Sequence, residues 1–196
     1  IRRQRQMCIR DRVYIADFKG GVDFPPIWHT KCSLLTDEKT LHKVLVSITD
    51  ELQSRKQILR TAGVANIDGY NRNAKKKLYR IVFACDEIAE VLDKTGLSKQ
   101  QKDEILKIES ELSIIARQGR AFGIHLVLAT QRPDAAILNG QIRNNIDTRI
   151  CGRADNVLSQ IILDNTDASD KIAKSSQGRF LTNSGKIFQA YWFDEN

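Results

Sequence analysis

The chain has 196 residues, of which 41% are hydrophobic and 28% are charged, a composition typical of a soluble globular domain. No apolar run approaches the roughly 18 residues that a membrane-spanning helix needs, and no stretch resembles the apolar core of a signal peptide. Four widely separated cysteines lack the spacing of a metal site or a disulfide framework. Of the formal net charge of +7, residues 1–12 contribute +4, so the remainder is only modestly basic.

The first half of the chain predicts two strands separated by a long helix. Apolar runs bounded by glycine or charged residues indicate the strands, and an apolar stripe at helical spacing indicates the helix. In chain order we expect a strand over 13–21, a helix from Thr36 or Asp37 to Gly63, an irregular polar connection over 64–77 and a strand over 79–85.

The second half continues the alternation and ends in a hairpin. We expect a helix from Ser98 to Gly119 or Gly123, strands over 124–131 and 148–151, a helix over 155–164, and a hairpin over 177–193 that turns at 183–185. Short apolar strands that alternate with longer helices predict an α/β fold, with a mostly parallel sheet, helices on both faces and a C-terminal β-hairpin. We expect one domain over 13–196 and assign no function to the arginine-rich leader, 1–12.

Polar side chains follow three of the predicted strands, at the point where each strand ends. Because ligands of parallel sheets gather outside the carboxyl ends of the strands, we expect these side chains to converge on one edge. They are Asp17 and Lys19 after the first strand, Asp86 and Glu87 after the second, and Thr130 and Gln131 after the third.

The two adjacent acids suit the hydrolysis of a nucleoside triphosphate. Asp86 would hold Mg²⁺, Glu87 would orient or deprotonate the attacking water, and Gln131 would sense the γ-phosphate or that water. The simpler alternative is that Asp86 and Glu87 are solvated acids at the start of a helix, where the dipole favours them, and that Gln131 is a turn residue.

Three stretches closely resemble the motor domain of the FtsK/SpoIIIE family of DNA translocases. They are IVFACDEIAEV, then IARQGRAFGIHLVLATQRPDAAILNGQIRNNIDTRICGR, and then ILDNTDASDKIAKSSQGRFL. The resemblance covers about residues 14–193, and DFKGG is most similar to members from Gram-positive bacteria, including those on conjugative elements. It implies a RecA-like ATPase that uses ATP and Mg²⁺ and forms a hexameric ring around double-stranded DNA. It also implies a cytoplasmic motor, which a separate N-terminal anchor attaches to the membrane in full-length members.

The resemblance also implies roles for individual residues. Asp86 and Glu87 match the Walker B acids, Thr130 and Gln131 match the sensor of the next strand, and Asp17 and Lys19 match the first strand's end. For an arginine that acts on a neighbour's nucleotide, Arg55 is the first candidate, and the others are Arg117, Arg120 and Arg149. The expected DNA contacts are Arg132, Arg143, Asn144 and Asn145, although the last three would equally brace the following strand.

The chain departs from the family because it contains no G-x-x-x-x-G-K-[ST] phosphate-binding loop. The family carries that loop just upstream of the segment matched here, so we expect a truncated motor domain whose 196 residues alone bind ATP very weakly and do not turn it over. Two alternatives stay open. One is a type VII secretion ATPase that moves polypeptide, against which ATQRP argues, and the other is a non-catalytic ring subunit, against which both acids argue.

Overall fold

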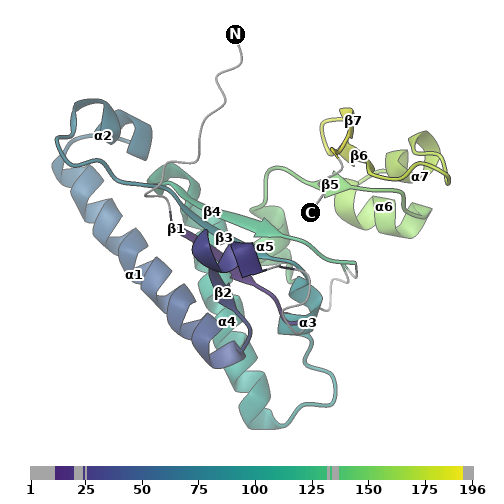
Figure 1. Cartoon of the computed structure of the whole chain (residues 1–196), viewed down its shortest axis with the longest axis horizontal. Coiled ribbons are helices and arrows are strands. Elements are labelled where there is room, and N and C mark those ends of the chain that lie inside the picture. Colours follow the sequence, from purple (N-terminus) through teal and green to yellow (C-terminus); the bar gives the residue numbers. More distant parts are fainter. Residues whose placement is uncertain (1–11, 20–23, 25, 132, 134–136, 192–196) are drawn as a thin grey trace. The chain divides into compact units, whose positions relative to one another are not determined.

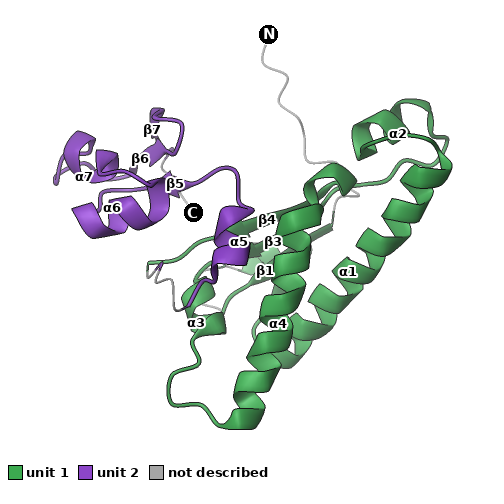
Figure 2. Ribbon diagram, turned by 180° about the vertical axis from the view of Figure 1, so that it is seen from behind, with its two compact units in different colours: residues 1–131 green, residues 132–196 purple. Residues whose placement is uncertain are grey.

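The computed structural model describes residues 12–19, 24, 26–131, 133 and 137–191 (Figure 1). The chain divides into two compact units, 1–131 and 132–196, which Figure 2 colours separately. Each unit contains its own sheet. The expectation of one domain over 13–196 stays a prediction. The candidate DNA contact Arg132 lies outside the described residues.

The first unit is built on a four-stranded parallel sheet with the strand order β2-β1-β3-β4. Its cores are the apolar runs that the sequence predicts as strands, and β3 runs in register with β1 on one side and β4 on the other. The elements are β1 (Arg12–Ala16), η1 (Pro26–Thr30), β2 (Ser33–Leu35), α1 (Glu38–Thr61), α2 (Ile67–Asn73), β3 (Ile81–Cys85), α3 (Ile88–Leu92), α4 (Lys99–Gln118), η2 (Arg120–Phe122) and β4 (Ile124–Leu128).

The two long helices begin where the sequence predicts them. The Asp37 carboxylate accepts a hydrogen bond of 2.8 Å from the Thr40 amide at the start of α1, and Ser98 forms a capping box with Gln101 at the start of α4. Figure 2 shows α1 and α4 side by side over one face of the sheet, whereas η1 lies on the opposite side of the sheet in Figure 1. The α/β class with a parallel sheet is confirmed.

The first unit differs from the expectations in three places. Residues 64–77 are not irregular throughout, because the Asn66 side chain caps α2 and Ile67 is buried. β2 was not predicted, because three residues are too few to show a period. The helix that the alternative for Asp86 and Glu87 places after these acids is present as α3, with Glu87 at its N-cap. Arg12, assigned to the leader, belongs to β1, where its amide donates to the Arg80 carbonyl oxygen.

The second unit has a three-stranded antiparallel sheet with the order β5-β6-β7. The predicted hairpin is confirmed: Gly185 adopts a positive φ of 80° in the turn between β6 and β7, a conformation that glycine reaches without strain. The sequence did not predict α5 and α7. The elements are α5 (Gly140–Asn144), β5 (Ile150–Cys151), α6 (Asn156–Leu163), α7 (Asp167–Lys171), β6 (Arg179–Thr182) and β7 (Ile187–Gln189).

A separate hydrophobic core holds the second unit together. It consists of buried side chains from α6, α7 and the sheet, namely Cys151, Ala154, Leu163, Ala168, Ile172 and Leu181. In both units, no helix of the described residues is sufficiently long and apolar to cross a lipid bilayer.

Candidate active site

The carboxyl ends of β1, β3 and β4 lie next to one another at one edge of the first unit's sheet. Ala16 is the register partner of Cys85, and Cys85 is the partner of Leu128. The contact continues past the strands, because the Asp86 amide donates to the Ala16 carbonyl oxygen at 3.2 Å and the Ala129 amide donates to the Cys85 carbonyl oxygen at 2.9 Å. The expected convergence of the three strand ends is confirmed.

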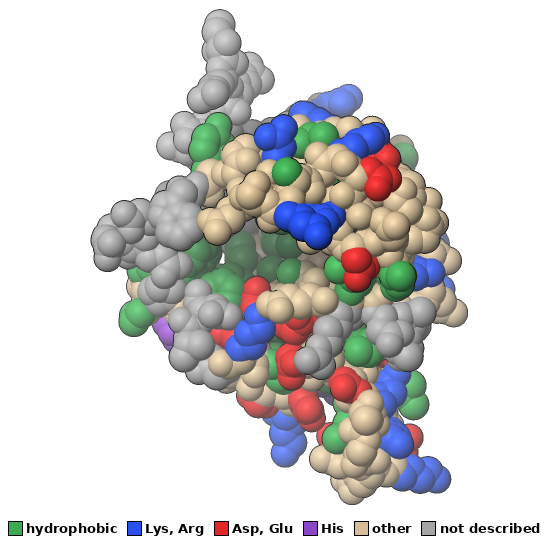
Figure 3. Space-filling model, turned by 90° about the vertical axis from the view of Figure 1, so that its right-hand side faces the viewer, with side chains coloured by type: hydrophobic (Ala, Val, Ile, Leu, Met, Phe, Trp, Pro, Cys, Tyr) green, Lys and Arg blue, Asp and Glu red, His purple; other side chains and the backbone are tan. Residues whose placement is uncertain are grey.

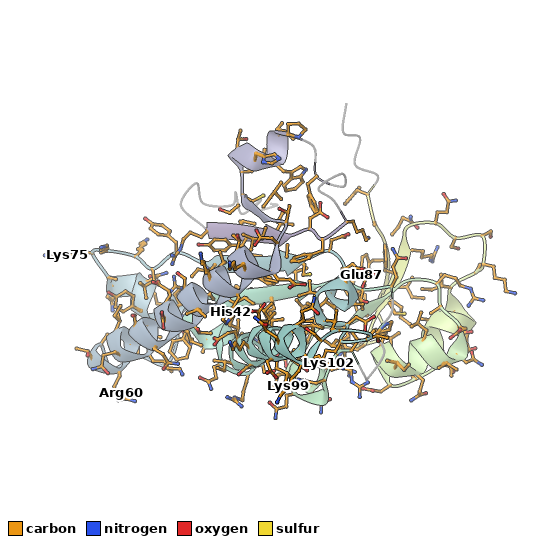
Figure 4. All side chains as sticks on the ribbon, turned by 90° about the horizontal axis from the view of Figure 1, so that it is seen from below. His42, Arg60, Lys75, Glu87, Lys99 and Lys102 are labelled. Carbon is orange, nitrogen blue, oxygen red and sulfur yellow. The ribbon has the colours of Figure 1, made fainter. Side chains whose placement is uncertain are left out.

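Glu87 joins the end of β3 to the end of β4. Its side chain is 7% exposed and caps the N-terminus of α3, where Oε1 accepts a hydrogen bond of 3.2 Å from the Ala89 amide (Figure 4). The Thr130 hydroxyl also donates to Oε1, and the Gln131 amide donates to Oε2 at 2.8 Å. Both oxygens of the carboxylate are therefore held by the chain itself, which fixes a proton acceptor at the strand ends.

Asp17 and Asp86 are linked through a single lysine. The Lys19 amide donates to Asp17 Oδ1 at 2.9 Å, and the Lys19 ammonium forms an ion pair of 2.9 Å with Asp86 Oδ2. The Asp17 side chain is 0% exposed, and its Oδ2 has no hydrogen-bond donor within the described part of the chain. A buried carboxylate oxygen without a donor fits a cation, and carboxylate oxygens are the protein ligands that Mg²⁺ prefers.

The electrostatic field at this edge is negative. Burial, together with the charges of Asp86, Glu87 and Asp17, raises the pKa of the Cys85 thiol to about 12. The negative charge of these three carboxylates disfavours a thiolate at the end of β3. The same negative charge attracts a divalent cation. Cys85 itself is buried, as the sequence predicts.

Arg55 is buried in the first unit. Its side chain is 2% exposed, and the guanidinium donates to the Phe122 carbonyl oxygen at 2.7 Å, the Tyr79 carbonyl oxygen at 2.8 Å and Glu51 Oε1 at 2.9 Å. These bonds tie α1 to the loops before β3 and β4. Buried and held in this way, the Arg55 guanidinium braces the fold of its own chain, and its role towards a neighbour's nucleotide stays a prediction.

The other candidate arginines have different environments. Arg149 in the second unit donates to Asp164 Oδ2 at 2.5 Å. Arg117 and Arg120 are exposed and line a pocket of about 550 Å³ together with Arg80 and His125. Since Arg80 precedes β3 and His125 is the second residue of β4, this pocket lies at the amino-terminal end of these strands, away from Asp86.

The candidate DNA contacts that can be placed lie in or beside α5. Arg143 and Asn144 belong to this helix, and Asn145 caps its end by donating from its side chain to the Gln141 carbonyl oxygen at 2.7 Å. This contact is to α5 and not to the following strand β5, so both the DNA contact and the strand-bracing alternative for Asn145 stay predictions. On the face in Figure 3, the described Lys and Arg side chains alternate with Asp and Glu side chains and do not form one continuous basic area.

Sequence reasoning missed three features of the site: the ion pair of Lys19 with Asp86, the hydrogen bond from Thr130 to Glu87, and the Asp17 oxygen that has no donor among the described residues. One signal for the first was present, because a lysine two residues after a strand-end aspartate can reach the neighbouring strand's acid. The other two depend on how the strand ends pack and have no local signal.

No family model matches the chain. Among curated proteins, DNA translocase FtsK of Chlamydia pneumoniae is 33% identical over 148 residues, which span 72% of this chain and 18% of that protein. DNA translocase FtsK of Chlorobaculum tepidum is 32% identical over 156 residues, which span 79% of this chain and 18% of that protein. The chain thus spans about a fifth of the length of these relatives.

Solved structures show the same relationship. The pCW3 conjugation coupling protein TcpA, in a monomer form with ATPgS, has a TM-score of 0.88 and 38% identity, covering 95% of this chain and 53% of TcpA. The type VII secretion ATPase EccC of Thermomonospora curvata has a TM-score of 0.69 and 22% identity over 94% of this chain and 22% of EccC, which shows a common fold alone. With its RecA-like parallel sheet and its FtsK-like sequence, the chain belongs to the FtsK/SpoIIIE family of P-loop ATPase motor domains.

Proposed function

We propose that this chain is the major part of an ATP-driven motor that moves double-stranded DNA, and that the complete protein works as a hexameric ring. The FtsK relatives are named as DNA translocases, which supports DNA as the cargo. The 38% identity to a conjugation coupling protein over 95% of this chain favours conjugative transfer as the process served.

One observation carries the proposal of an ATPase site. The Glu87 carboxylate is buried and fixed between the ends of β3 and β4, beside the pair formed by Lys19 and Asp86. A fixed carboxylate next to a candidate cation site is the arrangement that triphosphate hydrolysis needs, because the reaction depends on positioning and charge stabilisation.

Each residue of the edge has a separate task in this proposal. Asp86 holds Mg²⁺, which when bound neutralises the charge of the phosphates. Glu87 orients the attacking water and accepts its proton, while the backbone amide of Gln131 and the hydroxyl of Thr130 fix that carboxylate. The Gln131 side chain senses the γ-phosphate. Asp17 and Lys19, which follow β1, complete the nucleotide-binding residues at the carboxyl ends of the strands.

The 196 residues contain no phosphate-binding loop sequence. Since backbone amides of that loop and its lysine supply most contacts to the phosphates, we propose that these residues alone bind ATP weakly and do not hydrolyse it. Turnover then requires a longer protein that carries both this segment and a phosphate loop.

For the trans-acting arginine we propose the exposed Arg117 or Arg120, because Arg55 is buried and Arg149 is paired with Asp164. For DNA, we propose that Arg143 and Asn144, with Arg132 and Asn145, contact backbone phosphates without base readout, so that binding weakens steeply with salt and is independent of sequence.

The test uses the longer protein and measures ATP hydrolysis with and without double-stranded DNA. We expect DNA to stimulate hydrolysis, and Glu87→Gln to lower the stimulated rate by about 10²–10⁴-fold, the usual contribution of a positioned base. Glu90→Gln is the matched control, because Glu90 is an exposed glutamate on α3. If Glu87→Gln retains the rate of this control, Glu87 is not the base. If polypeptide stimulates hydrolysis and DNA does not, the proposed cargo is wrong.

A further inference from the structure

The two aspartates at the carboxyl ends of β1 and β3 occupy equivalent places on these neighbouring strands. Asp17 and Asp86 directly follow Ala16 and Cys85, which are register partners on β1 and β3. Neighbouring strands lie about 4.8 Å apart, so two carboxylates at this position repel each other unless a cation is present. In the metal-free chain, the cation beside Asp86 is the Lys19 ammonium.

The two aspartates are not equally satisfied by this lysine. Asp86 is partly exposed and pairs with the ammonium, whereas Asp17 is fully buried and, among the described residues, accepts from the Lys19 backbone amide on Oδ1 and from no other donor. Its second oxygen, Oδ2, has no donor within the described residues. A buried carboxylate oxygen with no donor is an unfavourable arrangement that a bound cation would relieve.

We propose that Asp17 is a second carboxylate ligand of the divalent cation, and that the Lys19 ammonium occupies the cation's place until the metal displaces it. This inference rests on the proposed function, which places Mg²⁺ at Asp86, and adds Asp17 and the competing lysine. No group of three acidic, histidine or cysteine side chains that could hold a metal occurs in the described part of the chain. Two carboxylates are nevertheless sufficient for Mg²⁺, which usually takes one or two together with water and phosphate oxygens.

Competition by Lys19 has a consequence that a purely ligand-binding lysine would not have. If Lys19 only contacted phosphate, removing its charge would leave metal binding in the absence of nucleotide unchanged. Because the ammonium and the metal compete for Asp86, removing the ammonium must raise the affinity of the empty site for a divalent cation. A displaced Lys19 ammonium is then available to pair with a phosphate, so metal and nucleotide binding support each other.

The experiment titrates the nucleotide-free 196-residue chain with Mn²⁺ and follows free Mn²⁺ by electron paramagnetic resonance. We expect Lys19→Met to raise the Mn²⁺ affinity by about 10-fold and Asp17→Asn to lower it by 10-fold or more, the range seen when groups around a metal are altered. The control is Lys75→Met, which removes the same charge from an exposed lysine that Figure 4 places far from Glu87. This control should leave the affinity unchanged.

The thermal unfolding midpoint is a second readout, which distinguishes weak Mn²⁺ binding from poor folding of a variant. Mn²⁺ should raise the thermal unfolding midpoint of Lys19→Met more than that of the unaltered chain, and should raise that of Asp17→Asn least. Unchanged Mn²⁺ affinity in Lys19→Met, or equal affinity in Asp17→Asn and the unaltered chain, would overturn the inference. These results can be distinguished from a failure of the proposed function, because Mn²⁺ binding is measured without nucleotide or turnover, whereas the role of Glu87 is measured as the rate of hydrolysis by the longer protein.

Discussion

Replacing Arg55 by methionine should destabilise the first unit strongly, because it removes a buried guanidinium and leaves its acceptors unpaired. Methionine keeps most of the apolar stem but donates no hydrogen bond. Two backbone carbonyl oxygens, those of Tyr79 and Phe122, and one oxygen of Glu51 lose their donor. Since a hydrogen bond to a charged group contributes about 1.5–3 kcal/mol, the two carbonyl bonds alone give a loss of about 3–5 kcal/mol after partial rehydration.

The measurement is urea unfolding followed by circular dichroism. With an m-value of about 2 kcal/mol/M, Arg55→Met should lower the midpoint by about 1.5–2.5 M. Arg55→Lys keeps the charge but not the planar set of donors, and it should lower the urea midpoint by about half as much. The midpoint of this variant can be measured even if the methionine variant does not fold. Arg60→Met is the control, because Figure 4 shows Arg60 pointing away from α1, and its loss should stay below about 1 kcal/mol.

The pH dependence of the same variants gives a second check. Burial raises the pKa of Glu51, but the hydrogen bond and charge of Arg55, with Arg12, outweigh it and hold the pKa below its ordinary value. A depressed carboxylate pKa adds stability above the unfolded pKa, near 4.3, and this stability disappears as the pH falls through the folded pKa. The difference between the unaltered chain and Arg55→Met should therefore shrink below about pH 4.

A loss in Arg55→Met no larger than in Arg60→Met would refute this reasoning. It would mean that the Arg55 guanidinium is not part of the folded core. If Arg55→Met in the longer protein abolished ATP hydrolysis with no loss of stability, Arg55 would act on a nucleotide and would not brace the fold.

Two further predictions follow from the local geometry. Gly123→Ala should lower the unfolding free energy by about 1 kcal/mol more than Gly63→Ala in thermal unfolding. Both glycines have a positive φ, but an added Cβ at Gly123 would lie 2.5 Å from Cδ1 at the end of the buried Ile67 side chain, which must then shift, whereas at Gly63 it meets no atom within 4 Å. Equal losses would contradict the clash. Because burial and nearby carboxylates raise the Cys85 pKa to about 12, a thiol reagent at pH 8 should label the half-buried Cys32 first and Cys85 only after unfolding. Labelling of folded Cys85 at the rate of Cys32 would contradict its burial.

The sequence predicted those parts of the fold whose causes are local. Apolar runs and helical spacing located β1, β3, β4, α1 and α4, and side-chain caps at Asp37 and Ser98 marked where both long helices begin. The edge that carries Asp17, Asp86 and Gln131 was also predictable, because parallel strands bring their carboxyl ends to the same side. Short elements such as β2 and α5 were not predicted, because they show no complete period.

The tertiary structure alone decided how the charged side chains are used. Two basic side chains serve different purposes: the Arg55 guanidinium donates in the core to a carbonyl oxygen 67 residues away, whereas the Lys19 ammonium pairs at the sheet edge with an acid 67 residues away. Glu87 is likewise held by a hydroxyl 43 residues further along the chain. A charge acquires its role from the partners and the solvent around it, and folding brings these together from segments that the local sequence does not connect.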